Sequence, residues 1–97
     1  MNNIEIEKLI KKLETEKINI IDIREPIEYQ LGRIPTALNI DKYALIKYPE
    51  MYLQKGKTYY IYCNSGVLSN RVVNQLNTQG YSTVNINGGY NNYLLRK

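Results

Sequence analysis

The chain has 97 residues, 43% of them apolar, and a formal net charge of +4 at pH 7. This length suits one domain with a modest core, so we expect residues 1–97 to form a single domain. One cysteine excludes an intramolecular disulfide, and the absence of histidine excludes Ser-His-Asp catalysis, Cys-His catalysis and most zinc sites. Catalysis would have to come from a thiol, carboxylates, basic side chains or backbone N–H groups.

Cellular location and partners can be argued from the same features. A lone cysteine fits a reducing compartment, and the N-terminus lacks the basic and apolar stretches of a secretory signal. No apolar run approaches the ~20 residues that span a bilayer. We therefore expect a cytoplasmic protein that binds no membrane. The lysines near the N-terminus alternate with glutamates and the others are scattered, which argues against nucleic-acid binding and favours small anions.

The first third of the chain predicts a helix, a strand and a long connection. Apolar residues at helical spacing predict a helix over about 3–16, capped by Asn3: they are Ile6, Leu9, Ile10 and Leu13. Residues 18–23 are mostly apolar and β-branched, as in a strand buried on both faces. Residues 24–36 contain two prolines and a glycine, which predict a connection with at most a helical turn.

The middle of the chain predicts two further strands. Residues 37–40 form a short strand candidate, and Asp41 can cap a weak helix over 42–48 that Pro49 ends. After a turn at Gly56, residues 58–63 read as a second buried strand that finishes on Cys63.

The last third repeats the alternation. A second set of residues at helical spacing, apolar except for its first member, predicts a helix that Gly80 ends: Ser69, Val72, Val73 and Leu76. Residues 81–86 predict the last strand, and a short helix containing Tyr90 and Tyr93 follows. Strands alternating with helices predict an α/β fold, with a mainly parallel sheet of about four to five strands and helices on both faces. Ligands of such sheets bind beyond the carboxyl ends of the strands, where Cys63 lies.

The loop after Cys63 has the features of an anion cradle. Gly66 permits left-handed backbone angles, so the loop can turn several N–H groups inward at the start of the next helix. Such a nest lowers the pKa of a thiol and holds an anion beside it. A thiolate and a cradle without a base suit the transfer of sulfur or phosphoryl groups.

Spacing separates these two chemistries. Cysteine phosphatases need arginine six residues after the cysteine to clamp phosphate oxygens. In this chain that position is Ser69, and the nearest arginine is Arg71. Phosphoryl transfer is therefore disfavoured.

Three sequence motifs follow one another along the chain. Residues 22–39 are similar to Asp-x-Arg-x-x-x-Glu-Tyr-x-x-Gly-His-Ile-Pro-Gly-Ala-x-Asn, with Arg33 at the histidine and Thr36 at the second glycine. Residues 62–69 are similar to Tyr-Cys-x-x-Gly-x-Arg-Ser, with Leu68 at the arginine. Residues 88–93 are similar to Gly-Gly-x-x-x-Trp, with Tyr93 at the tryptophan. Together and in this order, the three motifs resemble those of the single-domain rhodanese family of sulfurtransferases.

The resemblance implies a sulfurtransferase that carries a persulfide on Cys63 and needs no metal or organic cofactor. The loop residues expected to bind the substrate are Asn64, Ser65, Gly66, Val67, Leu68 and Ser69. Ser69 is expected to cap the helix and to donate its hydroxyl to the sulfur. Asp22 and Arg24 are expected to be a structural pair that braces the active edge. The implied partners are a small anionic sulfur donor such as thiosulfate or a persulfide-donating protein, and a thiol or cyanide-type acceptor.

Leu68 is the departure with a chemical consequence. Arginine at this position helps to attract an anionic donor, and its loss removes a charge-assisted contact of ~1.5–3 kcal/mol. Use of free thiosulfate would suffer more than persulfide loading by another protein. The alternative is a carrier or interaction module of the same fold with little thiosulfate turnover. Arg71 could replace part of the lost charge, although a solvated arginine on the helix surface is the simpler interpretation.

Overall fold

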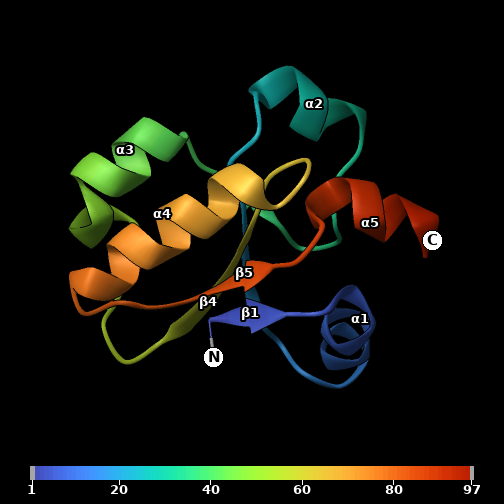
Figure 1. Cartoon of the computed structure of the whole chain (residues 1–97), viewed down its shortest axis with the longest axis horizontal. Helices are drawn as coiled ribbons and strands as arrows, with labels where there is room; N and C mark the ends of the chain where they lie inside the picture. Colours follow the sequence, from blue (N-terminus) through green and yellow to red (C-terminus); the bar gives the residue numbers. More distant parts are fainter. Residues whose placement is uncertain (1, 97) are drawn as a thin grey trace.

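A five-stranded sheet runs through the centre of the computed structural model, which describes residues 2–96 (Figure 1). Its strand order is β1-β5-β4-β2-β3, and every neighbouring pair is parallel. The strands are β1 (Asn3–Ile4), β2 (Asn19–Asp22), β3 (Leu38–Asn39), β4 (Thr58–Tyr62) and β5 (Ser82–Ile86). The prediction of an α/β fold with a parallel sheet is confirmed.

Helices cover both faces of this sheet, as expected for parallel strands joined by crossovers. They are α1 (Ile6–Thr15), α2 (Pro26–Leu31), α3 (Lys42–Lys47), α4 (Val67–Thr78) and α5 (Gly89–Leu95), with a short 3-10 turn at Pro49–Met51. The helices α3 and α4 pack on one face, and α1 and α5 pack on the other (Figure 1).

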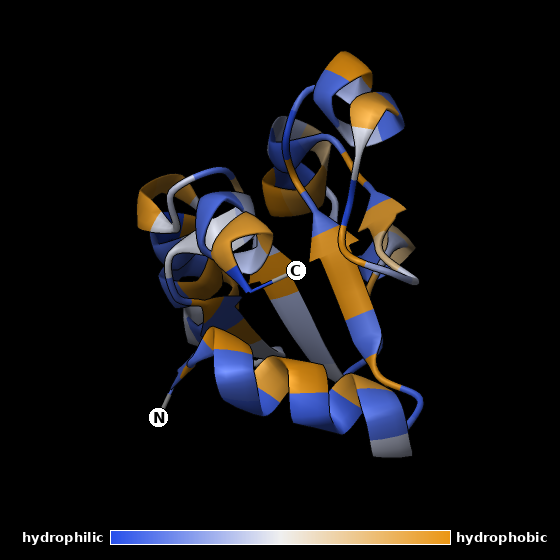
Figure 2. Ribbon diagram, turned by 90° about the vertical axis from the view of Figure 1, so that its right-hand side faces the viewer, coloured by the Kyte–Doolittle hydropathy of each residue, from blue (hydrophilic) through white to orange (hydrophobic). Residues whose placement is uncertain are grey.

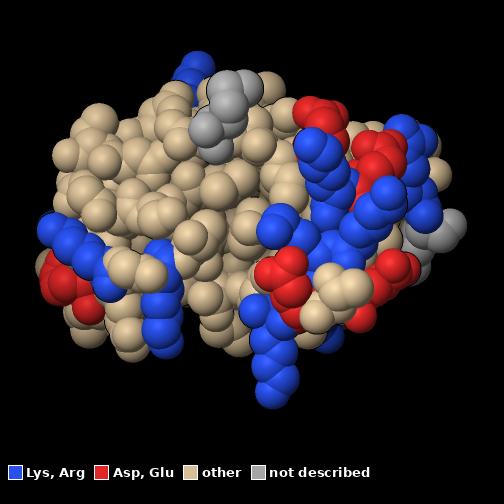
Figure 3. All heavy atoms as spheres, turned by 90° about the horizontal axis from the view of Figure 1, so that it is seen from below, with Lys and Arg blue, Asp and Glu red and all other residues tan. Residues whose placement is uncertain are grey.

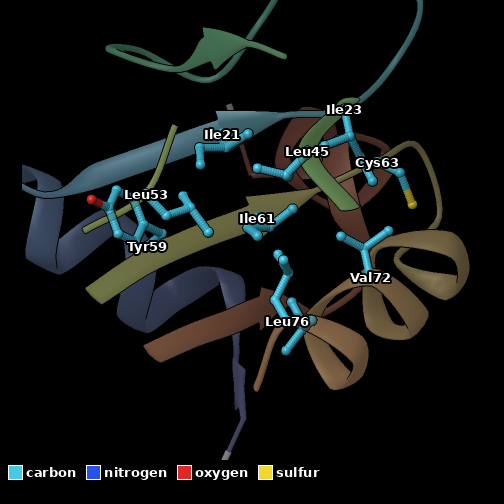
Figure 4. Packing of buried hydrophobic residues seen from close by; sticks show 10 residues of the cluster. Ile21, Ile23, Leu45, Leu53, Tyr59, Ile61, Cys63, Val72 and Leu76 are labelled. Atoms are coloured by element: carbon cyan, nitrogen blue, oxygen red, sulfur yellow. The ribbon is translucent and has the colours of Figure 1, made fainter. Parts of the chain in front are cut away.

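The core between the sheet and α3 and α4 extends up to Cys63. Its members include Ile61 from β4, Leu45 from α3 and Val72 from α4. Figure 4 shows Cys63 at the end of this cluster, beside Ile23 and Val72, with its sulfur turned toward the loop that precedes α4. On one side, the cysteine is therefore held in place by packing against buried apolar side chains.

A second core fills the space between the sheet, α1 and α5. Ile6 and Leu9 of α1 are buried there with Ile20 of β2 and Ile86 of β5. Polar and apolar bands alternate along α1 in Figure 2, as its helical periodicity predicts.

The start of the first helix differs from the prediction. Asn3 does not cap it, because Asn3 and Ile4 form β1 and pair with Asn85 and Ile86 of β5. The helix begins at Ile6, with Glu5 in the capping position. Local periodicity cannot reveal this strand, because its partner lies some 80 residues along the chain.

The prediction of at most a helical turn within residues 24–36 is wrong for Pro26–Leu31, which form α2. Proline is favoured at the first helical position, and Glu25 and Glu28 complete a reciprocal capping box. The proline that was expected to interrupt structure starts the helix instead. The predicted cap of α3 is confirmed, because Asp41 accepts a hydrogen bond from the Ala44 N–H at 3.0 Å.

Thr36 adopts a left-handed backbone with φ of 71°, at the position where the rhodanese motif has glycine. A β-branched residue is strained in this region. A glycine at this position would adopt the same conformation without that strain.

Charges of both signs are mixed over the α1 side of the molecule, where acidic side chains lie among the basic ones (Figure 3). This mixture matches the alternation of lysine and glutamate near the N-terminus of the sequence. Within residues 2–96, no helix has the length and apolar character needed to cross a membrane.

Candidate active site around Cys63

Cys63 lies directly after β4, in a loop that ends at the start of α4. Its side chain is only 6% exposed. Two backbone N–H groups donate hydrogen bonds to the sulfur, from Gly66 at 3.2 Å and from Ser69 at 3.3 Å. The loop therefore curls around the sulfur, as the sequence predicts.

Gly66 makes this curl possible. It caps α4 with φ of 91°, a conformation that L side chains rarely adopt. A Cβ atom here would lie 2.9 Å from the backbone nitrogen of Gly88, in the turn before α5. Only glycine lets the loop approach the β5–α5 turn so closely.

Opposing effects act on the thiol. Burial raises the pKa of Cys63, and hydrogen bonds to the sulfur lower it. They come from the Ser69 hydroxyl, when that hydroxyl is turned toward the sulfur, and from the backbone N–H groups of Ser69, Gly66 and Ser65. The net pKa of Cys63 lies below its ordinary value. With the Ser69 hydroxyl turned toward the sulfur, the site favours a thiolate without any histidine.

Ser69 does not cap α4 as predicted, because the helix begins two residues earlier and Gly66 is its cap. Its hydroxyl lies 3.3 Å from the Cys63 sulfur and donates to Asn85 Oδ1 at 2.5 Å. Ser69 is fully buried.

Asn85 is a site residue that sequence analysis missed. It lies on β5, is 3% exposed, and donates from Nδ2 to the Gly66 carbonyl at 3.2 Å. The available signal was an asparagine within a predicted strand whose other positions are partly apolar. If such a residue is buried, its amide needs hydrogen-bond partners, which marks it as part of a polar network.

The N-terminus of α5 holds the other side of the loop. The Tyr90 N–H donates to the Cys63 carbonyl at 2.9 Å, and the Asn91 N–H donates to the Asn64 carbonyl at 3.0 Å. Because these carbonyls are bound outward, the later N–H groups of the loop are free to face the sulfur.

Asn64 also connects the loop to α2. Its Nδ2 donates to Glu28 Oε2 at 2.7 Å. This hydrogen bond, followed by that from the Glu25 N–H, holds the pKa of Glu28 below its ordinary value. These contacts make Glu28 a structural support of the loop.

Asp22 and Arg24 lie at the end of β2, next to the end of β4. The Arg24 guanidinium binds Asp22 Oδ2 at 2.8 Å and the Gly32 carbonyl at 2.6 Å, and it stacks 4.1 Å from the centre of the Tyr90 ring. Tyr62, which directly precedes the cysteine, donates its hydroxyl to Asp22 at 2.5 Å. The pair is part of a buried network beneath the active edge.

Three of the predicted substrate-binding residues, Ser65, Val67 and Leu68, lie on the outer side of the loop. Ser65 is exposed, while Val67 is 63% exposed and Leu68 is 38% exposed. Ser65 and Val67 also line a cavity of about 480 Å³ beside the loop. Arg71 lines the same cavity and is exposed, as the simpler interpretation holds.

The arrangement can stabilise negative charge on sulfur by hydrogen bonds alone. A thiolate can attack a sulfur atom, and the N–H groups around it can stabilise the sulfur anion that follows. Among residues 2–96, no three Cys, Asp or Glu side chains gather closely enough to hold a metal ion.

Comparison with known proteins places this geometry in a family. The model of the rhodanese-like domain matches residues 5–96. A sulfurtransferase from Allochromatium vinosum is 37% identical over 91 residues, which cover 92% of this chain and 84% of the relative.

Two solved structures agree with the sequence match. A Staphylococcus saprophyticus protein has a TM-score of 0.88 at 32% identity, covering 96% of this chain and 93% of its own. A rhodanese-like domain protein from Staphylococcus aureus has a TM-score of 0.80 at 35% identity, covering 92% and 87%. With its parallel sheet and its cysteine loop, the chain belongs to the rhodanese-like domain family.

Proposed function

We propose that this protein is a sulfurtransferase that carries sulfane sulfur as a persulfide on Cys63. The observation that carries the proposal is the pair of N–H groups, from Gly66 and Ser69, directed at a buried sulfur at 3.2 and 3.3 Å. A relative that is named a sulfurtransferase supports the same reaction class.

The first step loads the cysteine. The Cys63 thiolate attacks the outer sulfur of a donor, an S–S bond forms to Cys63, and the donor's own S–S bond breaks. Thiosulfate would leave as sulfite, and a persulfide donor would leave as its thiolate. Hydrogen bonds from the loop stabilise the sulfur anion that remains on Cys63.

The second step unloads it. A thiolate or cyanide attacks the outer sulfur of the persulfide and departs as a new persulfide or as thiocyanate, and Cys63 is released as a thiolate. Cys63 is the single cysteine of the chain, so no second thiol of the same chain can take the sulfur. The acceptor comes from outside.

A persulfide carrier with little thiosulfate turnover is the second candidate. The observation that favours it is Leu68, an apolar side chain that is 38% exposed at the motif's arginine position. An exposed apolar side chain attracts an anion poorly but does not obstruct a protein that presents a persulfide.

Sulfur loading tests the proposal directly. The purified protein is incubated with thiosulfate or with a low-molecular-weight persulfide and analysed by intact mass. One added sulfur atom is expected, which cyanide removes as thiocyanate and which is absent in Cys63→Ser. Loading by the persulfide alone would favour the carrier. If neither donor adds sulfur and no thiocyanate forms, the proposed transfer is wrong.

A further inference from the structure

The Ser69 hydroxyl has two neighbours and one hydrogen. Its oxygen lies 2.5 Å from Asn85 Oδ1 and 3.3 Å from the Cys63 sulfur. A hydroxyl donates one hydrogen bond, so it can serve either the amide oxygen or the sulfur at one time.

The orientation of the Asn85 amide decides which neighbour receives it. Asn85 Nδ2 lies 3.2 Å from the carbonyl oxygen of Gly66, which can only accept. The NH₂ group must therefore face Gly66, and Oδ1 must face Ser69. Because Oδ1 can only accept as well, the hydroxyl hydrogen belongs to Asn85 in the resting site.

In this arrangement Ser69 Oγ is the hydrogen-bond acceptor that faces the Cys63 sulfur. A lone pair of Ser69 Oγ faces Cys63 and suits the neutral thiol, whose S–H can donate to it. To stabilise a thiolate, the hydroxyl has to turn toward the sulfur and leave Asn85 Oδ1 without its donor. Asn85 is 3% exposed, so solvent cannot readily replace that bond.

We propose that Asn85 is a positioning residue that holds the Ser69 hydroxyl hydrogen away from Cys63 and so restrains thiolate formation in the resting site. The inference deepens the proposed function, since it assumes that Cys63 is the reacting group. It assigns β5 a part in controlling that group.

Charged groups around the site do not replace this control. The elements around the loop carry Arg24, Glu28, Lys42 and Arg71. Arg24 binds Asp22, Glu28 binds Asn64, and Lys42 pairs with Glu25. In the part of the chain that the structure describes, the groups that hydrogen-bond the sulfur are uncharged.

The test is the pH profile of Cys63 alkylation by iodoacetamide, together with thiolate absorbance. Asn85→Leu removes the acceptor of the Ser69 hydroxyl and frees that hydroxyl to donate to the Cys63 thiolate. The midpoint of the alkylation pH profile should therefore fall by about one pH unit. Asn85→Asp also loses the bond to Gly66 but keeps a stronger acceptor, so its midpoint should rise. General loosening of the loop would move both variants in the same direction.

A double variant tests whether Asn85 acts on Cys63 through the Ser69 hydroxyl. In a Ser69→Ala background, Asn85→Leu should no longer change the midpoint, because there is no hydroxyl to release. If the midpoint of Asn85→Leu is unchanged or higher, or if its downward shift persists without Ser69, the inference is wrong. Should Leu not pack at this position, Asn85→Ala removes the same acceptor and carries the same expectation.

Asn77→Leu is the matched control. Asn77 also joins α4 to β5, through hydrogen bonds of 2.9 and 2.7 Å from Thr83, and it has no contact with the sulfur. This variant should lower the melting temperature without moving the midpoint. Alkylation needs only a thiolate, so sulfur loading can fail while the midpoint shifts, or the reverse. The two proposals are thereby tested separately.

Discussion

Leu68 occupies the arginine position of the active-site motif, in the first turn of α4. The N–H groups of the loop still offer hydrogen bonds to an anion, but no side chain at this position adds charge. We therefore expect the side chain at this position to affect the choice of donor without changing the loop, because its backbone is part of a regular helix.

Leu68→Arg should raise kcat/KM for thiosulfate by about 10- to 100-fold, since a charge-assisted hydrogen bond contributes ~1.5–3 kcal/mol. Steady-state thiocyanate formation measures this change. Val67→Arg is the control, because it adds the same charge one residue away on a side chain that is 63% exposed. Equal gains in both variants would mean that overall charge, not this position, attracts the donor.

At the scale of elements, the start of α5 is tied to the loop by backbone alone. Gly89 has φ of 58°, and a Cβ atom there would overlap the carbonyl oxygens of Cys63 and Asn64. The close approach lets the first N–H groups of α5 bind those carbonyls. The conformation of the loop thus depends on a helix that follows it by more than twenty residues.

Gly89→Ala should destabilise the protein by about 3 kcal/mol, combining left-handed strain with a backbone clash, and should reduce sulfur loading. Urea unfolding and intact mass measure the two effects. Gly56→Ala is the matched control, because Gly56 also has a positive φ, of 94°, but open space where the Cβ would lie. It should cost about 1 kcal/mol and leave loading intact. Equal losses in the two variants would contradict the clash.

Across the whole molecule, one buried network joins segments distant in sequence. Tyr62 of β4 donates to Asp22 of β2 and accepts from the Ile34 N–H at 3.1 Å. Burial, followed by the hydrogen bond to Asp22, raises the pKa of Tyr62, so its hydroxyl remains a donor throughout the physiological range. Arg24 extends the network to Tyr90 of α5.

Tyr62→Phe should lower the free energy of unfolding by about 2–3 kcal/mol, because it removes a hydrogen bond to a buried carboxylate and leaves the Ile34 N–H unpaired. Urea unfolding provides the measurement. Tyr59→Phe is a matched control on the same strand, where the hydroxyl accepts one neutral hydrogen bond from the Gln54 N–H at 2.8 Å. Its cost should be about 1 kcal/mol. A loss at Tyr62 no larger than that at Tyr59 would contradict this role of the network.

Local patterns were sufficient for most of the fold. The strands β2, β3, β4 and β5 and the helices α4 and α5 follow from apolar patterns and from glycines at their ends. Each of them is signalled by residues that are neighbours in sequence. The α2 helix was missed because Pro26 reads as a breaker unless its capping box is recognised. The β1 strand was missed because two residues form a strand only when β5 is there to pair with them.

The sequence by itself determined that the chain has one cysteine and no histidine, that Cys63 follows a buried strand, and that Gly66 can curl the loop around it. Only the tertiary structure decided which groups from distant segments surround the sulfur and hold its loop. Asn85 reaches Ser69 from β5, and α5 binds the Cys63 carbonyl. These contacts depend on parallel strands that bring their carboxyl ends to one edge, an alignment that arises from packing between distant segments and leaves no periodic signal in the sequence.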